Sequence, residues 1–346
     1  MTGNEERELL RESLRRLIVW YESVRRPLPW RDSPTPYTVW ISEIMLQQTR
    51  IEAVIPYYTR FLSELPDIPA LAAVPEDRLL KLWEGLGYYS RARNLKKTAV
   101  IAVEQYGGEL PASAAELRKL PGIGDYTAGA IASIAFGLPE PAVDGNVLRV
   151  MARLLASQED VMLQTARRRF TELLRSRYPA GEAAGLLTEG IMELGETVCL
   201  PNGLPRCGSC PVRNLCAAHL AGEELSYPVK AAKKARRTEE KTVLLLHCSG
   251  KYAIRKRPDT GLLAGLWEFP NLEGKLTPEA LQELYPGCDI RAAGSTKHIF
   301  THVEWHMTGY SLECPEELPG FLWKTPQEIE EACSLPTAFR YYRKKL

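Results

Sequence analysis

Apolar residues recur with the period of an α-helix from residue 1 to about residue 220. The segment 8–20 places its apolar residues on one stripe and its arginines and glutamates elsewhere: Leu10, Leu14, Leu17 and Ile18. Further helices are predicted over 76–84, 90–106, 113–119, 125–136, 146–155, 164–177 and 182–197. The short connections contain Gly or Pro, which is typical of a compact helical array. We therefore expect a mainly α-helical N-terminal region.

The pattern changes after about residue 240. Segments with the residue types of β-strands are then separated by Gly and Pro: 242–247, 252–255 and 305–312. They predict a separate α+β domain over 241–346. Before it, a basic run is either a solvated linker or a contact to a DNA backbone: Lys230, Lys233, Lys234, Arg236 and Arg237.

Length and charge narrow the choice of partners. The chain has 346 residues, enough for two or three domains, and a net charge of +1 from 44 basic and 43 acidic residues. A nucleic acid would therefore have to be bound by local patches. No apolar run reaches membrane-spanning length, and the polar N-terminus lacks the core of a signal peptide. We expect a cytoplasmic, reducing location, where the eight cysteines are thiols or metal ligands.

Four of these cysteines form a tight group with the pattern Cys-x7-Cys-x2-Cys-x5-Cys: Cys199, Cys207, Cys210 and Cys216. Four thiolates in one short loop can surround a single metal centre. A structural zinc usually takes two Cys-x2-Cys pairs, and only one is present, so the spacing favours a 4Fe–4S cluster over zinc. The other four are widely scattered and are interpreted as structural: Cys248, Cys288, Cys314 and Cys333.

Two carboxylates, Glu43 and Asp144, flank a glycine hairpin in the sequence. The hairpin Pro-Gly-Ile-Gly, with Gly122 and Gly124, precedes a helix and suits a phosphate. Two carboxylates beside a held phosphodiester suggest cleavage of a glycosidic bond on a nucleotide. The pattern alone would make Glu43 an exposed helix residue, and Asp144 is also a candidate N-cap of the helix starting near Asn146. Asp144 can serve both purposes, and Asn146 could orient its carboxylate.

These motifs, in this order, resemble the helix–hairpin–helix DNA glycosylases of the endonuclease III superfamily, and within it the MutY-type adenine DNA glycosylases. The similarity covers nearly the whole chain and is carried by five segments: 29–31, 40–49, 85–94, 120–124 and 143–146. The resemblance implies four parts. They are an iron–sulfur helical domain (1–29 and 140–222), a six-helix domain with the hairpin (30–139), a basic linker (223–240) and a Nudix-like 8-oxoguanine recognition domain (241–346).

The resemblance also implies roles for the carboxylates. Glu43 would be the general acid that protonates adenine, and Asp144 the ionised group that stabilises the oxocarbenium-like sugar. The four cysteines would hold a 4Fe–4S cluster. The partner would be double-stranded DNA containing A:8-oxoguanine or A:G mispairs, bound by a monomer.

Tyr126 occupies the place where strand-cutting relatives have a lysine that forms a Schiff base with the sugar. No lysine occurs between Lys119 and Lys230. We therefore expect a monofunctional glycosylase in which water attacks the sugar. The alternative for Tyr126 is an aromatic that packs between helices.

Other residues match the family's DNA contacts, because a target base has to be flipped out of the duplex. Gln48 and Tyr88 are candidate wedges, and Thr49 and Leu86 would flank the opposite base. The candidates for the adenine pocket are Trp30, Arg31 and Glu189. Ordinary packing is the alternative for Leu86 and Tyr88, and Arg91 and Arg93 either touch phosphate or face solvent.

The C-terminal domain departs from the family in one position. Its loop Phe300-Thr301-His302 stands where the family usually has Phe-Ser-His, so 8-oxoguanine recognition should survive. The stretch after 267–270 lacks the acidic cluster that binds Mg²⁺ in Nudix hydrolases, so no hydrolase activity is expected. The first cysteine gap is seven residues, where the family usually has six.

Two rival functions remain on the sequence. A glycosylase for another mismatch, such as T:G, is disfavoured by the loop 300–302, because shorter relatives lack that domain. A non-catalytic sensor of DNA damage is disfavoured by the intact Glu43 and Asp144.

Overall fold

The computed structural model describes residues 3–231 and 236–346, so Lys233 and Lys234 of the predicted basic linker lie outside the described residues. Two compact units are present. The first contains residues up to 73 and 94–231, and the second contains 74–93 and 236–346. Among the described residues, no helix is both long and apolar enough to cross a membrane.

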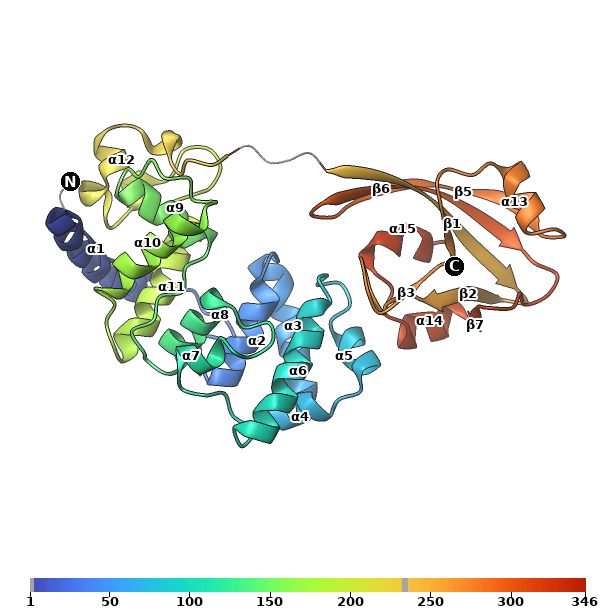
Figure 1. Cartoon of the computed structure of the whole chain (residues 1–346), viewed down its shortest axis with the longest axis horizontal. Coiled ribbons are helices and arrows are strands. Elements are labelled where there is room, and N and C mark those ends of the chain that lie inside the picture. The colour runs from blue at the N-terminus through green and yellow to red at the C-terminus, as the bar shows by residue number, and fades with distance from the viewer. Residues whose placement is uncertain (1–2, 232–235) are drawn as a thin grey trace. The chain divides into compact units, whose positions relative to one another are not determined.

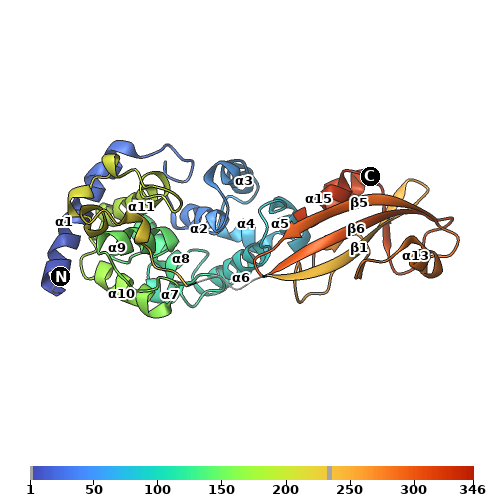
Figure 2. The same cartoon turned by 90° about the horizontal axis from the view of Figure 1, so that it is seen from above.

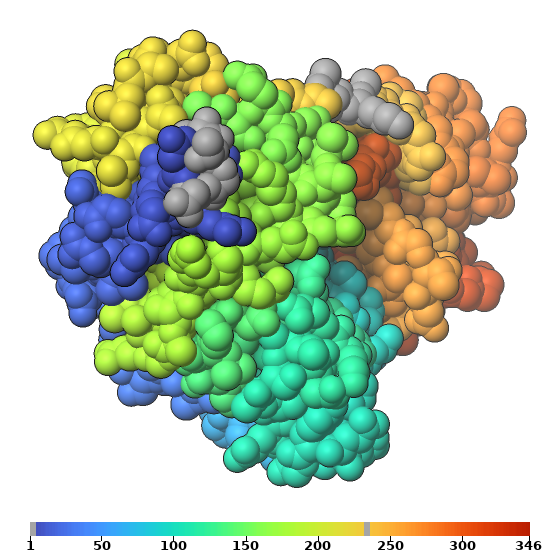
Figure 3. Space-filling model, turned by 60° about the vertical axis from the view of Figure 1, so that its left-hand side comes forward, coloured from blue at the N-terminus to red at the C-terminus, as the bar shows by residue number. Residues whose placement is uncertain are grey.

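The first unit is helical, as predicted (Figure 1). Its helices are α1 (Gly3–Val24), α2 (Pro36–Leu46), α3 (Ile51–Glu64), α4 (Ile68–Ala73), most of α6 (Ser90–Gln105), α7 (Ala114–Leu117), α8 (Asp125–Ala130), α9 (Gly145–Leu154), α10 (Gln164–Arg175), α11 (Glu182–Thr197) and α12 (Ala217–Leu220). The predicted stripe of α1 is confirmed, because Leu10, Leu14 and Leu17 are buried in one core with apolar residues of α9, α10 and α11. The space-filling view shows the blue N-terminal helix beside the yellow-green segment that includes α11 (Figure 3).

The second unit is built on a mixed sheet, which confirms the predicted α+β class. Its strands are β1 (Arg237–Cys248), β2 (Lys251–Lys256), β3 (Trp267–Glu268), β4 (Asn271–Glu273), β5 (Asp289–Ile299), β6 (Val303–Glu313) and β7 (Leu322–Lys324). The main order is β3-β2-β1-β6-β5, and β1 pairs with β6 in parallel (Figure 2). The helices of this unit are α5 (Glu76–Leu82), α13 (Pro278–Leu284), α14 (Pro326–Ala332) and α15 (Arg340–Arg343).

Several elements differ from the prediction: α3, α4, β3, β4 and β7 are not predicted, and two further elements differ for clear physical reasons. The helix expected over 125–136 changes after α8 into a π-helical turn, Ile131–Ala135. Strand β5 was not predicted, because Asp289–Ile299 has few β-branched residues and contains Gly294 at an irregularity in the pairing. Its pairing with β6 supplies the order that its own sequence does not indicate.

Candidate active site

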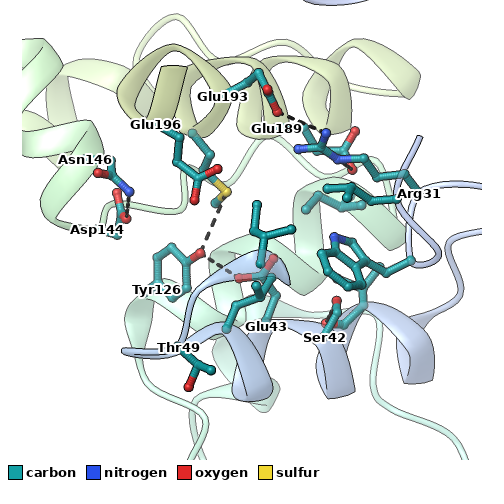
Figure 4. A pocket seen from close by; sticks show the side chains of 17 residues that line it. Arg31, Ser42, Glu43, Thr49, Tyr126, Asp144, Asn146, Glu189, Glu193 and Glu196 are labelled. Atoms are coloured by element: carbon teal, nitrogen blue, oxygen red, sulfur yellow. Dashed lines mark hydrogen bonds and ion pairs between the residues drawn. The ribbon is translucent and has the colours of Figure 1, made fainter. Parts of the chain in front are cut away.

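A pocket of about 110 Å³ in the first unit gathers all of the predicted catalytic and adenine-pocket residues (Figure 4). Helix α2 contributes Glu43, the start of α8 contributes Tyr126, and the start of α9 contributes Asp144 and Asn146. The pocket is also lined by other predicted site residues: Trp30, Arg31, Thr49 and Glu189. In Figure 4, Asp144 and Asn146 lie at one end, Arg31 and Glu189 at the other, and Glu43 between them.

Glu43 is buried, with 6 % of its surface exposed, so the exposed position that its pattern alone favours is wrong. Helix α2 is fixed at its start by a capping box between Thr35 and Thr38, with Pro36 at the first helical position. Burial raises the pKa of Glu43 to about 7, and the nearby Asp144 carboxylate adds to the rise. The raised pKa lets Glu43 hold a proton much closer to neutral pH than an ordinary glutamate does, which suits a general acid.

Tyr126 holds the Glu43 carboxylate. Its hydroxyl donates to Glu43 Oε2 at 2.6 Å. Burial, together with the carboxylates of Glu43 and Asp144, raises the pKa of Tyr126 well above its ordinary value. The phenol therefore keeps its proton and orients Glu43, so the alternative of a purely packing aromatic does not describe its contacts.

Asp144 is the N-cap of α9, as the alternative interpretation predicted. Its Oδ1 accepts from the Val147 backbone N–H at 2.8 Å. Its Oδ2 accepts from Asn146 Nδ2 at 2.9 Å, which orients the carboxylate toward the pocket. Burial raises the pKa of Asp144, while these N–H donors oppose the rise and favour the ionised form. One side chain therefore caps a helix and presents a carboxylate to the pocket.

Arg149 is a residue that sequence reasoning missed. It is buried on α9, where its Nη2 donates to Asn146 Oδ1 at 2.9 Å and its Nε to the Cys199 carbonyl at 2.7 Å. A Cβ on Gly195 would lie 2.7 Å from Asn146 Cβ, so glycine is needed there for Asn146 to keep its place. A continuous chain of contacts thus joins Asp144 to the cysteine loop. The only sequence signal was an arginine on the apolar face of a predicted helix.

The far end of the pocket is a network of buried charges. Arg31 lies 3.0 Å from Glu193 and 3.6 Å from Glu189, counting nitrogen to oxygen. Tyr21 donates its hydroxyl to Glu189 at 2.8 Å. Trp30 is buried and packs edge-on against Tyr58. This network offers carboxylate acceptors and guanidinium donors to a polar base, and Glu193 and Glu196 are lining residues that sequence reasoning missed.

The hairpin before α8 has the conformation that its glycines predict. Gly122 has a φ of +77°, and a Cβ there would lie 2.6 Å from Asn94 Cβ, so only glycine fits. Gly124 is the N-cap of α8, and a Cβ there would meet nothing within 4 Å. Gln48, the predicted wedge next to Thr49, also has a positive φ of 60°. Gln48 does not line the pocket, whereas Thr49 does.

The remaining DNA-contact candidates belong to the second unit. Tyr88 is 48 % exposed with a φ of 47°, and its hydroxyl lies 2.8 Å from Thr301 Oγ1. Thr301 and His302 are exposed at the turn between β5 and β6. Phe300 is half-buried and packs against Trp305, with ring centroids 5.0 Å apart. Tyr88 and the loop 300–302 thus share one exposed surface.

The contacts of Leu86, Arg91 and Arg93 bear on the alternatives predicted for them. Leu86 is buried, so packing accounts for most of its surface. Arg91 is also buried and donates to the carbonyls of Leu86 and Gly87, so the prediction that it faces solvent is wrong, and the phosphate contact stays a prediction. Arg93 instead pairs with Glu76 at 2.7 Å.

The four loop cysteines line one small cavity beside α9, α11 and α12. The thiol donor set fits an iron–sulfur cluster, and the fold is compatible with one. Cys207 also lies near His219 and Glu224, whose ligand atoms are within 4.8 Å of one another and of its thiol. Such a mixed set would suit zinc.

Elsewhere, Cys288 and Cys314 are distant in sequence but have their Sγ atoms 2.7 Å apart.

Comparison with protein families assigns both halves of the chain. Residues 41–176 match the HhH-GPD superfamily of base excision DNA repair proteins, and residues 242–345 match the NUDIX domain. Among solved structures, a thermostable thymine-DNA glycosylase superposes with a TM-score of 0.56 at 27% identity, covering 64% of this chain and 100% of that one. An endonuclease III–DNA covalent intermediate gives a TM-score of 0.52 at 26% identity, covering 64% and 97%.

Relatives from distant organisms share one enzyme name. Adenine DNA glycosylase of Rattus norvegicus is 34% identical over 95% of this chain and 77% of its own length. The Homo sapiens enzyme is 34% identical over 94% and 73%, and that of Buchnera aphidicola (subspecies Schizaphis graminum) is 34% identical over 84% of both chains. With the buried acid, the capping carboxylate and the glycine hairpin in one unit, this chain belongs to the adenine DNA glycosylase family of base excision repair enzymes.

Proposed function

We propose that this enzyme removes adenine mispaired with 8-oxoguanine or guanine from double-stranded DNA, by acid-assisted hydrolysis of the N-glycosidic bond. The observation that carries the proposal is Glu43, buried with a pKa of about 7 in the same pocket as Asp144. Glycosidic cleavage needs one protonated and one ionised carboxyl group, and different environments are what separate their roles.

The two ends of the pocket are proposed to receive the two parts of the nucleotide. The target nucleotide leaves the base stack and enters the pocket. Adenine faces Trp30, Arg31 and Glu189, and Glu43, held by Tyr126, protonates a ring nitrogen. The positive charge that develops on the sugar faces Asp144, which Asn146 orients. Electrostatic stabilisation of that charge is strongest in a site closed to water.

The residues that line the pocket all lie in the described part of the chain, and none of them is a lysine. Water is therefore the group that attacks the sugar. Tyr126 cannot form an imine. Borohydride added during turnover should trap little protein–DNA adduct. Efficient trapping at one residue would contradict the monofunctional assignment.

The loop 300–302 is proposed to read 8-oxoguanine in the opposite strand. A hydroxyl from Thr301 and an imidazole from His302 can bond the extra carbonyl and the protonated ring nitrogen that distinguish this base from guanine. Both side chains are exposed, and Tyr88 lies within hydrogen-bond distance of Thr301. Gln48, Thr49 and Leu86 are proposed to complete the contacts at the opened step, and Gly122 and Gly124 to offer backbone N–H groups to a phosphate.

A 4Fe–4S cluster is proposed as the metal centre, held by Cys199, Cys207, Cys210 and Cys216. When bound, the cluster would fix the loop by iron–thiolate bonds. Arg149 would then link the cysteine loop to the residues around Asp144, because it donates hydrogen bonds to both the Cys199 carbonyl and Asn146. Purified protein should contain about four irons per chain. Stoichiometric zinc without iron after anaerobic preparation would contradict the cluster.

One assay tests the proposed reaction against its rivals. Labelled duplexes with A:8-oxoguanine, A:G, T:G and A:T pairs are incubated with the enzyme, and abasic sites are revealed with alkali. Cleavage of the first two substrates supports the proposal. Cleavage of T:G instead would indicate another mismatch glycosylase, and binding without cleavage would indicate a damage sensor.

A further inference from the structure

A second cavity, of about 340 Å³, adjoins the catalytic pocket in the first unit. It shares Tyr126 with that pocket and is also lined by Val143, the residue before Asp144. The facing wall is one side of α10, whose residues at spacings of three and four positions reach the cavity: Gln164, Arg168, Thr171 and Arg175. We call this space the α10 cavity. The mechanism above uses none of its arginines.

The α10 cavity carries an excess of positive charge. Four arginines line it, and two of them are already neutralised: Arg118 pairs with Asp125 at 2.9 Å and Glu140 at 3.3 Å, and Arg175 pairs with Glu140 at 3.1 Å. Arg167 and Arg168 have no carboxylate partner within the part of the chain that the structure describes.

The two unpaired arginines differ in what holds them. Arg167 donates to the Val143 carbonyl, which fixes it next to the residue that precedes Asp144. Arg168 is exposed. Against the four arginines stand three carboxylates, Asp125 and Glu172 in the lining and Glu140 beside it, so one guanidinium group stays unbalanced. An unbalanced positive charge next to an active site attracts an anion.

We propose that the α10 cavity binds phosphate groups of the DNA backbone next to the target nucleotide, with Arg168 as the main contact and Arg167 as the fixed one. The inference rests on the proposed DNA substrate. A strand whose target sugar faces Asp144 has to pass Val143 and Tyr126, which border the cavity. A guanidinium group matches two phosphate oxygens at once. Since the whole chain has a net charge of only +1, such local sites have to supply its attraction to DNA.

A backbone phosphate fits the lining better than a free nucleotide does. Tyr126 is the only aromatic residue of the lining, and its hydroxyl is engaged by Glu43. The cavity therefore lacks the stacking surfaces that hold an unpaired base. Its polar groups are arranged along a helix face, as expected for a surface that follows a strand.

The test is the salt dependence of duplex binding for Arg168→Ala, Arg168→Lys and a matched control, Arg177→Ala. Arg177 is exposed just after α10, but it does not line the cavity. Binding to an undamaged duplex and to an A:8-oxoguanine duplex is measured by fluorescence anisotropy between about 50 and 200 mM salt. Loss of one phosphate contact should lower the slope of log K against log salt by about 0.9 for Arg168→Ala.

The ratio of the wild-type affinity to the Arg168→Ala affinity should therefore fall by about 3.5-fold from the lowest to the highest salt concentration. Arg168→Lys should keep the wild-type slope because the charge remains, and Arg177→Ala should keep it too. Equal slopes for Arg168→Ala and Arg177→Ala would overturn the inference. An Arg168→Lys variant whose slope falls as far as that of Arg168→Ala would overturn it too. Free inorganic phosphate that competes no better than chloride at equal ionic strength supports a backbone phosphate. If phosphate instead displaces DNA from the wild type and not from Arg168→Ala, the site holds free phosphate and the inference is wrong.

The same measurements separate this inference from the proposed function. Absence of adenine excision by the wild type would overturn the proposed function, while the slopes on undamaged duplex would still decide whether the cavity binds DNA.

Discussion

The catalytic pocket and the loop 300–302 differ in their proposed tasks, excision of adenine and recognition of the opposite base, and in how far they are buried. In the pocket, Glu43 is buried and Asp144 is partly buried, and each is held by hydrogen bonds from fixed neighbours. In the loop, Thr301 and His302 are exposed at the end of a hairpin. Chemistry on adenine requires shifted pKa values and few waters, whereas reading a base in DNA requires groups that DNA can reach. Changes in the pocket should therefore affect rate, and changes in the loop should affect the choice of substrate.

The largest effect is expected for Glu43→Gln. An amide cannot deliver the proton, so the single-turnover excision rate should fall by about 10²–10⁴-fold, with DNA affinity nearly unchanged. The measurement is single-turnover cleavage of an A:8-oxoguanine duplex beside an anisotropy titration. A rate within tenfold of the wild type would remove Glu43 from the mechanism.

Asp144→Asn separates the two tasks of one side chain. Asparagine is as good an N-cap as aspartate, so the melting temperature should stay close to that of the wild type. The negative charge facing the sugar is lost, so excision should fall by about 10²-fold or more. If instead the protein melts earlier and keeps its rate, Asp144 is only a cap.

The pH dependence should report the pKa of Glu43. The rate constant should fall about tenfold per pH unit above pH 7, because the acid loses its proton. The stability follows the same group. The folded pKa of about 7 lies above the ordinary 4.5, so the stability due to neutral Glu43 is complete below pH 4.5 and is lost as the pH rises through 7.

This loss amounts to about 3 kcal/mol at high pH. Glu43→Gln has no such titration, so its free energy of unfolding, relative to the wild type, should rise between about pH 4.5 and pH 7 and level off above that. Parallel stability curves for the two proteins would show that the pKa of Glu43 is not raised.

The smallest effect is expected for Thr301→Ala with His302→Ala. Each lost hydrogen bond is worth about 1 kcal/mol, so the preference for A:8-oxoguanine over A:G should drop roughly tenfold or more, while excision from A:G changes less. Both substrates are compared at one salt concentration, because phosphate contacts dominate the total affinity. An unchanged ratio would place discrimination with Thr49, Leu86 and Tyr88 instead.

The sequence predicted the elements better than the contacts. Periodicity located α9, α10 and α11 to within about two residues, and the N-cap role of Asp144 followed from a local rule. The burial of Glu43 did not follow from α2 alone, because α8 and α11 cover it from distant parts of the chain. Arg149 was missed for the same reason: its distant partner, the Cys199 carbonyl, follows α11 and is brought to it by the packing of α9 against α11, and only Asn146 is a local partner on α9.

The arrangement at Asp144 affects how variants of this enzyme can be sorted. A substitution that preserves the cap and removes the charge would pass a screen based on expression yield, solubility or melting curve. Such a protein would accumulate in a cell at normal levels and still bind damaged DNA. Under the proposed function, it would occupy mispairs without excising adenine from them.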